Sequence, residues 1–431
     1  MQRKNENSYI KKVIANIAWM IFDKVFLLLL NLLVTVKIAN YYGAEVYGIH
    51  QYAVSIIAVF EILLRFVDAR VVKKQYALKP AEDVVFSATV SRIFFSLFSF
   101  VIGIVFLLLY KGSRAFSIIF VVLLLNAIIS ELRFGMANRF EYLLKVKKIV
   151  IAGNVASTIG SILQLVAVYL NLSIVAISVI ALITSIINLF ILMMQYYNEF
   201  GKSVRHRLDR VMLKDIIMES IPLMISASCV TVYTRCDSIM LGSMMTTVEV
   251  GIYAISNKLV HIVQIMVAPI RESVYPKLIQ LYHSDDERYE REYVRISSIL
   301  TWIYIIGIMV SFIILPFAFT FLNDEYSQAF GIYKIHAIGS FFVYNTALRA
   351  GHFTLVNKGI VLTWTSFLSM FVNIILNYVF ISRLGMYGAA IATVTTQCIS
   401  LMLFNSFFAE GRKVLKWQLK AINPIYIIKK V

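Results

Sequence analysis

Long apolar runs, separated by short polar or basic segments, recur along the whole chain. A bilayer core about 30 Å thick needs roughly 20 apolar residues in each helix that crosses it, and a helix satisfies its own backbone hydrogen bonds in lipid. The pattern therefore predicts an all-α polytopic membrane protein with about twelve transmembrane helices. The predicted spans are 12–38, 46–68, 84–109, 115–135, 149–170, 172–195, 215–242, 250–270, 293–321, 328–348, 359–381 and 386–409.

Composition agrees with this interpretation, because 60% of the 431 residues are hydrophobic, more than one soluble core would hide. The first apolar run is too long for a cleavable signal peptide, and no small-residue cleavage site follows it. We therefore expect that this run is a transmembrane helix.

Positive charge is distributed unevenly between the two sides of the predicted topology. The chain carries 41 Lys and Arg residues and a formal net charge of +17. With the N-terminus placed in the cytoplasm, 31 of them fall in cytoplasmic segments, seven in spans, and only Lys111, Arg114 and Arg383 in outer loops. This asymmetry follows the positive-inside rule for an even number of spans with both termini in the cytoplasm. It explains the charge without nucleic-acid binding, and the basic loops are expected to meet anionic lipid headgroups.

The cysteines and histidines give no sign of a metal site. Cys229, Cys236 and Cys398 all fall within predicted spans and form no CxxC or metal-type spacing. The six histidines are scattered, without an HExxH or paired-ligand pattern. We expect no metal, no disulfide and no cofactor.

The two halves of the chain resemble each other. The segment "IANYYGAEVYGIHQYA" follows the first span and "LGSMMTTVEVGIYAIS" follows the seventh, and they align so that Gly48 meets Gly251. Six spans on each side of a basic segment would make a parallel repeat, a recurring transporter design. The predicted organisation is an N-terminal lobe at 1–197, a basic cytoplasmic linker at 198–214, a C-terminal lobe at 215–409 and a basic cytoplasmic tail at 410–431.

Polar residues form stripes along several predicted helices. Asn16, Asp23 and Lys37 are spaced by multiples of seven residues and share one helix face. Further stripes are His50, Glu61, Arg65 and Asp68; Glu219, Ser226, Tyr233 and Asp237; Asn257, His261 and Gln264; and Lys334, Asn345 and His352. Because a charge in lipid costs at least about 2.5–3.5 kcal/mol, such stripes imply a wet central cavity.

Some of these charges have a purely structural explanation. Glu61 and Arg65 are four residues apart, so they are able to neutralise each other on one helix. Lys37 and Asp68 lie near span ends, where a side chain can reach the interface by snorkelling. These four residues therefore give weak support for a functional cavity.

Five other embedded cations are the candidates for substrate binding, because the nearest acidic residues are too few to pair them all. They are Lys24, Arg92, Arg235, Lys258 and Lys334. The spans hold seven basic residues against five acidic ones, namely Asp23, Glu61, Asp68, Glu219 and Asp237. A net positive cavity suits anionic cargo, particularly phosphates, for which arginine supplies a planar fork of donors and lysine a compact charge.

Asp23 is the candidate for ion coupling. It lies about 16 Å along the first predicted helix, near mid-membrane. Burial favours the protonated carboxyl, whereas adjacent Lys24 favours the carboxylate. Two roles stay open for Asp23, a proton carrier and a fixed counter-ion.

Three stretches of the chain resemble the Wzx-type flippases that move lipid-linked polysaccharide repeat units in bacteria. They are "NIAWMIFDKVFLLLLNLLVTVKIANYYGAEVYGIHQYA", "YTRCDSIMLGSMMTTVEVGIYAISNKL" and "NIILNYVFISRLGMYGAAIAT". The third is the most specific, with Asn373 and Asn377 followed by Gly385 and Gly388, small residues that let helices and a tight turn approach closely. In the second, Asp237, Gly242, Gly251, Tyr253 and Lys258 match the family pattern.

The resemblance implies a fold shared with multidrug and toxic-compound extrusion (MATE) transporters and the lipid II flippase, with two six-helix lobes around a V-shaped central cavity. It implies no enzyme activity. The implied substrate is undecaprenyl pyrophosphate bearing an oligosaccharide, for O-antigen, lipopolysaccharide, capsule or exopolysaccharide synthesis. The implied location is the bacterial inner membrane. Implied partners are the lipid-linked oligosaccharide, membrane lipids, a polysaccharide polymerase and a chain-length regulator.

Three other functions are open. An ion-coupled exporter of organic cations from the same superfamily would need an acidic cavity, which the seven-to-five balance disfavours. A membrane polysaccharide polymerase or glycosyltransferase would need catalytic residues in sizeable external loops, and the predicted outer loops are short. A non-transporting scaffold would have no reason to keep unpaired charge in the membrane.

Overall fold

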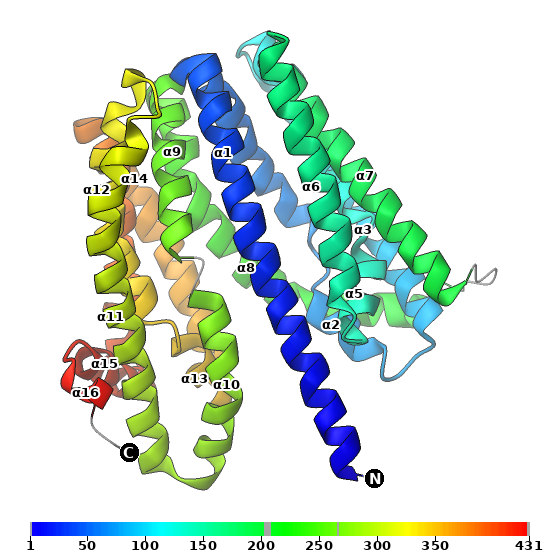
Figure 1. Cartoon of the computed structure of the whole chain (residues 1–431), viewed down its shortest axis with the longest axis vertical. Coiled ribbons are helices and arrows are strands. Elements are labelled where there is room, and N and C mark those ends of the chain that lie inside the picture. Colours follow the sequence, from blue (N-terminus) through cyan, green and yellow to red (C-terminus); the bar gives the residue numbers. More distant parts are fainter. Residues whose placement is uncertain (1, 202–207, 265–266, 429–431) are drawn as a thin grey trace. The chain divides into compact units, whose positions relative to one another are not determined.

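The computed structural model describes residues 2–201, 208–264 and 267–428, and within them all regular secondary structure is helical (Figure 1). The helices are α1 Gln2–Leu64, α2 Ala69–Gln75, α3 Ala81–Leu109, α4 Arg114–Glu131, α5 Phe134–Tyr142, α6 Val146–Tyr169, α7 Ile174–Phe200, α8 Arg210–Met244, α9 Thr247–Gln264, α10 Val267–Ser284, α11 Asp286–Phe319, α12 Ser327–Asn345, α13 Arg349–Leu355, α14 Gly359–Leu401, α15 Ala409–Ala421 and α16 Ile425–Ile428, with 3-10 helices at Asp324–Tyr326 and Leu403–Phe407.

Eight helical stretches of the described residues are long and apolar enough to cross a membrane. They are Ala81–Leu109, Arg114–Tyr142, Val146–Tyr169, Ile174–Phe200, Arg210–Met244, Thr247–Ser284, Asp286–Phe319 and Gly359–Phe407. The prediction of an all-α polytopic membrane protein is confirmed. The count of twelve spans stays a prediction.

Several helices begin at side chains that accept hydrogen bonds from otherwise unpaired amides of the first turn. Ser113 accepts from the amide of Phe116 at the start of α4, and Asp285 accepts from the amide of Arg288 at the start of α11. The sequence thus fixes where each of these helices enters the bundle.

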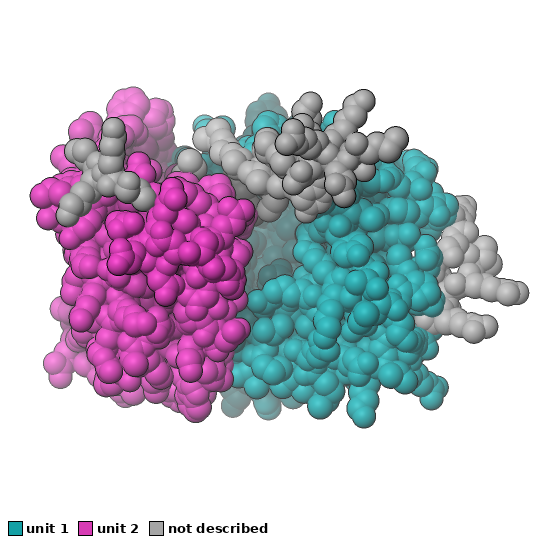
Figure 2. Space-filling model, turned by 90° about the horizontal axis from the view of Figure 1, so that it is seen from below, with its two compact units in different colours: residues 1–42, 49–231 teal, residues 43–48, 232–431 magenta. Residues whose placement is uncertain are grey.

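The chain divides into two compact units, coloured teal and magenta in Figure 2. Unit 1 comprises residues 1–42 and 49–231, and unit 2 comprises residues 43–48 and 232–431. The boundary falls within α8, whose first half packs with unit 1. Residues 202–207 of the expected linker lie outside the described residues, and the predicted lobe limits stay predictions.

Each unit has its own buried core. In unit 1, Val72, Phe140 and Ile216 pack together from α2, α5 and α8. In unit 2, Tyr293 and Trp417 belong to a buried hydrophobic cluster that joins α11, α13 and α15. Other faces of the long helices carry exposed apolar side chains, as expected for surfaces in contact with lipid.

Two long helices are bent at glycines with positive φ, a conformation that favours glycine. Gly43 (φ 73°) bends α1 between predicted spans 12–38 and 46–68. Gly385 (φ 57°) bends α14 between predicted spans 359–381 and 386–409. A Cβ on Gly388 would lie 2.0 Å from the carbonyl oxygen of Phe380, so the close turn that the third stretch predicts is confirmed.

The two glycines aligned by the internal repeat touch each other in unit 2. A Cβ on Gly48 would lie 1.7 Å from the carbonyl oxygen of Thr247 and 3.1 Å from the amide of Gly251. A Cβ on Gly251 would lie 2.2 Å from the carbonyl oxygen of Ala44. The backbones of segment 43–48 and α9 therefore pack at a distance that only glycine permits at both positions.

Candidate functional site

The predicted site residues fall in different parts of the fold. Asp23 and Lys24 belong to α1, but their side chains lie outside the described ones. Arg92 belongs to α3 of unit 1, whereas Arg235, Lys258 and Lys334 belong to α8, α9 and α12 of unit 2. Each unit is therefore described by itself.

Arg92 is buried in a network of charges and carbonyls in unit 1. Its Nη1 donates to Glu131 Oε2 (2.7 Å) and to the carbonyl of Leu64 (3.0 Å), and its Nη2 donates to the carbonyl of Val67 (2.5 Å). The guanidinium carbon lies 3.7 Å from the centroid of the Phe134 ring. Arg92 thus satisfies carbonyls at the end of α1 that have no partner within the helix.

The same network contains Arg65 and Glu61. Arg65 Nε donates to Glu131 Oε1 (2.9 Å), and Arg65 Nη2 lies 3.1 Å from Glu61 Oε2. The predicted pairing of Glu61 with Arg65 is confirmed. Two arginines and two carboxylates balance, so this cluster is neutral.

Glu131 is the residue that sequence reasoning missed, since it is absent from the five embedded acids named from the sequence. It lies at the last position of α4 and is 8% exposed. Its position inside predicted span 115–135 was a signal that could have identified it. Arg92 pairs with Glu131, so it is not one of the cations left without an acidic partner.

Two other embedded acids also have structural partners in unit 1. Asp68 caps α2, accepting from the amide of Arg70 (2.7 Å) and pairing with its guanidinium (2.8 Å). Glu219 pairs with Lys74 of α2 (2.8 Å). Both acids therefore hold α2 in place instead of forming part of a polar stripe.

Unit 2 contains a buried carboxyl group that is held by uncharged donors. Asp237 Oδ2 accepts from the hydroxyl of Tyr253 (2.6 Å), and Oδ1 accepts from the amide of Ser238 (2.7 Å). The Tyr253 ring packs edge-on against the His336 ring, 5.3 Å between centroids. Helices α8, α9 and α12 are thus joined around Asp237.

The asparagine pair of the third stretch lies beside this cluster. Asn377 Nδ2 donates to Asn373 Oδ1 (3.0 Å), and Asn373 Nδ2 donates to Thr396 Oγ1 (3.2 Å). The Cys236 thiol, next to Asp237 in sequence, also donates to Asn373 Oδ1. Both asparagines are fully buried, so they tie the two halves of α14 to α8.

Arg235 and Lys258 lie at nearly the same depth in unit 2. Arg235 is nine residues before the end of α8, about 14 Å, and Lys258 is eleven residues after the start of α9, about 16 Å. Both values are close to half of a bilayer core of about 30 Å. The two cations therefore occupy the middle of the expected membrane.

The environments of these two cations differ. Arg235 is exposed and forms no ion pair with any residue that the structure describes, although its charge acts on the ring of His261 and on Asp237. Lys258 is half-buried, with its ammonium 5.8 Å from the centroid of the Tyr47 ring. Arg235 is thus the more accessible of the two.

Lys334 lies on the exposed face of α12. It is exposed on α12, on the same side as Ile338, and its ammonium lies 4.6 Å from the centroid of the Phe330 ring. His336, two residues further on, faces the buried cluster around Asp237. Lys334 therefore lies on the exposed face of α12, opposite to the face that His336 turns toward the buried cluster.

Comparison with known families gives one match. The family model described as "Polysaccharide biosynthesis protein" matches residues 13–282. A search of curated proteins finds no match to this sequence.

Solved structures of transporters are similar along nearly the whole chain. An inward-facing multidrug resistance MATE family transporter of the MOP superfamily is 14% identical, with a TM-score of 0.68 over 94% of this chain and 96% of that one. Lipid II flippase MurJ, in an inward closed conformation, is 15% identical, with a TM-score of 0.68 over 97% and 93%. A mutant of the Vibrio cholerae MATE transporter VcmN is 15% identical, with a TM-score of 0.60 over 97% and 99%. These similarities show a shared fold.

Proposed function

We propose, from the premise that the chain belongs to the polysaccharide biosynthesis protein family, that it is a flippase for undecaprenyl-pyrophosphate-linked oligosaccharide repeat units. It moves them across the bacterial cytoplasmic membrane for O-antigen, capsule or exopolysaccharide synthesis. It works by alternating access, with both termini in the cytoplasm, and performs no enzymatic step. The fold it shares with lipid II flippase MurJ and with MATE transporters supports this proposal.

The observation that carries the proposal is Arg235. An exposed arginine near mid-membrane is costly in lipid, so it is expected to face water or protein rather than acyl chains. It has no ion pair among the described residues, and the nearby Asp237 carboxyl is held by Tyr253 and Ser238 instead. Its fork of donors therefore stays available for an anion.

A pyrophosphate is the anion in this substrate class that fits best. Arginine binds phosphate oxygens with two parallel hydrogen bonds, and Lys258 at the same depth adds a compact charge. The oligosaccharide needs a polar space, whereas the polyprenyl chain is able to stay in the surrounding lipid. Arg235 and Lys258 are therefore proposed as the residues that bind the pyrophosphate.

The remaining predicted site residues contribute differently to this proposal. Lys24 and Lys334 stay candidate contacts to the substrate, and Asp23 stays the candidate for ion coupling. Arg92 is proposed to act through positioning, because both of its Nη groups are occupied by Glu131 and by the carbonyls of Leu64 and Val67. The proposal thus rests on unit 2.

Charge reversal at Arg235 tests the proposal. In cells whose own copy is deleted, Arg235→Glu is expected to abolish surface polysaccharide, because a carboxylate repels the pyrophosphate. Lys258→Glu is expected to do the same, and Arg235→Lys is expected to retain part of the activity. Surface polysaccharide is measured alongside the amount of membrane-inserted protein.

A matched control is Arg383→Glu, the same change at another exposed arginine of unit 2, which is expected to leave polysaccharide at the normal level. Normal polysaccharide from well-inserted Arg235→Glu and Lys258→Glu proteins would contradict the anionic substrate. Export of organic cations that survives both reversals would instead favour the multidrug exporter.

A further inference from the structure

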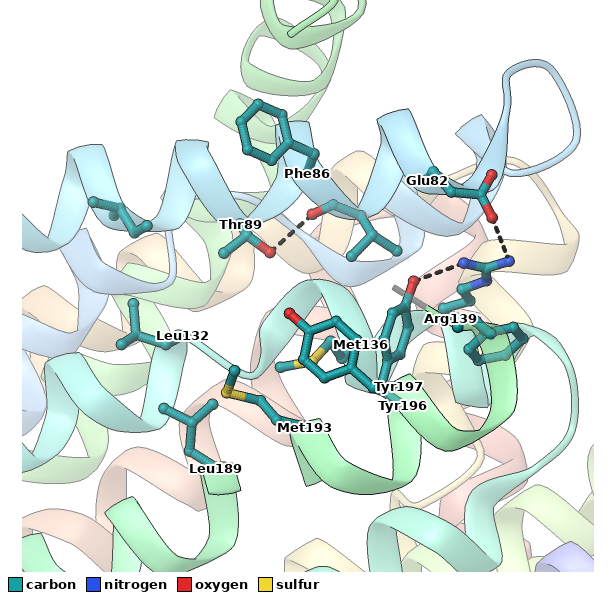
Figure 3. Close-up of a pocket in the computed structure, with 14 residues that line it drawn as sticks. Glu82, Phe86, Thr89, Leu132, Met136, Arg139, Leu189, Met193, Tyr196 and Tyr197 are labelled. Carbon is teal, nitrogen blue, oxygen red and sulfur yellow. Dashed lines mark hydrogen bonds and ion pairs between the residues drawn. The ribbon is translucent and has the colours of Figure 1, made fainter. Parts of the chain in front are cut away.

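Unit 1 contains a pocket that the proposed transport does not use. Its volume is about 420 Å³, within the range of about 300–1,000 Å³ that is typical of sites for small ligands. It lies between α3, α5 and α7, and Figure 3 shows its lining side chains. All of its lining residues belong to unit 1.

The pocket is polar at one end and apolar along its walls. Glu82, in the first turn of α3, pairs with Arg139 of α5 (2.9 Å), which also donates to the hydroxyl of Tyr196 of α7 (2.6 Å). The walls extend along α3 to Ile93, eleven residues and about 16 Å from Glu82. Apolar side chains line this stretch, namely Val85, Phe86, Leu132, Met136, Leu189 and Met193. The polar end thus lies at a terminus of two membrane helices, and the apolar part lies deeper.

Two hydrogen-bond donors at the pocket lack acceptors. Arg139 is 9% exposed, and its Nε donates to no acceptor among the residues that the structure describes. The hydroxyl of Tyr197 points into the pocket in Figure 3, and within the described parts of the chain it has no hydrogen-bond partner. The unsatisfied Arg139 Nε is buried and therefore costly, whereas Tyr197 is partly exposed; an occupant that brings acceptor oxygens to this place would satisfy both donors.

The charge at the polar end limits the kind of acceptor. Arg139 and Glu82 form an ion pair, and no other charged residue is found among the described residues that line the pocket. The described lining is therefore neutral, which suits uncharged ester carbonyl oxygens better than a phosphate group deep in the pocket.

The pocket opens onto apolar surface. Ile93 and Tyr197 line it and are 38% and 42% exposed. On the same helices, Phe94 and Leu97 of α3 and Met194 of α7 are also exposed. A ligand is therefore able to enter sideways from the hydrocarbon of the bilayer.

We propose that this pocket binds one acyl chain of a membrane phospholipid, with the ester carbonyl oxygens accepting from Tyr197 and Arg139. The order of headgroup, ester and chain in a phospholipid matches the order of polar end, free donors and apolar walls in the pocket. The bound lipid is a fixed component of unit 1, separate from the substrate, and its binding does not depend on the proposed flippase activity.

The test uses native mass spectrometry of the purified full-length chain, delipidated and then titrated with dioleoyl phosphatidylethanolamine. Met193→Trp fills the pocket and is expected to weaken the tightest binding event at least tenfold. Tyr197→Phe removes only a hydroxyl group and is expected to weaken it roughly two- to tenfold, the value of one hydrogen bond. Phe94→Trp adds similar bulk on α3 outside the pocket lining and is expected to bind lipid as the unchanged chain does.

Equal lipid affinity in Met193→Trp and Phe94→Trp would overturn the proposal, and so would equal affinity in Tyr197→Phe and the unchanged chain. If Met193→Trp does not fold, the comparison of Tyr197→Phe with the unchanged chain alone decides the test.

Polyprenyl phosphate is added as a competitor, and displacement of the phospholipid at equimolar concentration would assign the pocket to a substrate tail instead. Arg235→Glu should bind phospholipid normally, which separates this result from failure of the flippase proposal.

Discussion

The two units differ in whether the arginines of their membrane-length helices form ion pairs with described residues. In unit 1, Arg92 and Arg65 are paired with Glu131 and Glu61, and Arg92 also binds backbone carbonyls. In unit 2, the nearest acid to Arg235, Asp237, is held by a tyrosine hydroxyl and a backbone amide. An arginine that holds helices together is thus paired with a carboxylate. An arginine open to a ligand has a nearby carboxyl group that is hydrogen-bonded to other donors.

This difference shows what keeps Arg235 available in unit 2. Asp237 is two residues from Arg235 on α8, a spacing at which helix side chains do not face each other. Asp237 is buried instead, and its Oδ2 accepts from the Tyr253 hydroxyl (2.6 Å). Unit 2 therefore keeps a cation and an anion close in sequence without pairing them.

The largest expected effect comes from removing Glu131 in unit 1. Glu131→Ala leaves Arg92 buried without its counter-charge, and breaking one partner of a buried ion pair costs about 3–5 kcal/mol. We expect a large loss of folded protein, measured as the thermal midpoint and the yield of monodisperse protein in detergent.

A matched control is Glu61→Gln, which changes the half-exposed acid of the same network. An exposed ion pair contributes about 0–1 kcal/mol, so little change is expected. If Glu131→Ala is as stable as Glu61→Gln, the charges of unit 1 are not structural, and the contrast between the units fails.

The second effect concerns Tyr253 in unit 2. Tyr253→Phe removes a hydrogen bond to a buried carboxyl group, worth about 1.5–3 kcal/mol, and leaves more of the Asp237 charge to act on Arg235. We expect moderate destabilisation and, in the protein that still folds, weaker transport, measured as surface polysaccharide per inserted protein.

The double variant with Asp237→Asn separates these two consequences. An asparagine carries no charge to neutralise Arg235, so transport should recover relative to Tyr253→Phe even where stability does not. Transport that falls equally in both variants would mean that Asp237 does not control Arg235.

The sequence predicts spacing along a helix well, and contacts between helices poorly. The pairing of Glu61 with Arg65 and the turn at Gly385 follow from neighbours on one segment. The pairing of Arg92 with Glu131 joins α3 to α4, and no sequence pattern fixes the rotation of one helix against another. The sequence therefore identifies Arg235 and Arg92 alike as embedded cations, and only the partners found in the structure separate them.

The internal repeat illustrates the same limit. The alignment of Gly48 with Gly251 compares two distant segments, and the structure places these glycines in contact. Small residues allow close packing of backbones, which explains the contact that the structure shows. The alignment itself gave no reason to expect the two glycines to touch each other.

The third effect tests this contact, which fixes the position of α9 and therefore of Lys258. Gly251→Ala places a methyl group 2.2 Å from the carbonyl oxygen of Ala44, and overpacking of this kind costs about 1–3 kcal/mol. We expect a lower thermal midpoint and reduced transport.

Gly153→Ala in α6 of unit 1 is the control, because a Cβ there meets no atom within 4 Å. An alanine in a helix is favoured over glycine by up to about 1 kcal/mol, so this variant should be slightly more stable. Similar behaviour of the two alanine variants would mean that the glycine contact does not constrain unit 2.

The smallest effect compares one end of each unit as pH falls. In unit 2, His352 of α13 binds the hydroxyl of Tyr289 (2.8 Å) and Glu410 of α15 (3.2 Å). Burial lowers the pKa of His352 from its usual 6.5 and outweighs Glu410, which raises it, while Lys413 lowers it further. In unit 1, a hydrogen bond from Lys79 lowers the pKa of Asp209 below its usual 3.8.

The sign of each contribution follows from linkage. The unfolded state takes up a proton at His352 as pH falls below about 6.5, whereas the folded state resists it, so stability at this end of unit 2 is lost on acidification from pH 7. Asp209 stays ionised until pH falls below 3.8, so the stability at this end of unit 1 is unchanged over the same pH range.

Hydrogen exchange of α15, corrected for intrinsic rates, should therefore accelerate between pH 7 and about pH 5.5, while that of the first turns of α8 should not. His352→Gln should remove the acceleration, and its persistence in that variant would assign the pH response to another group.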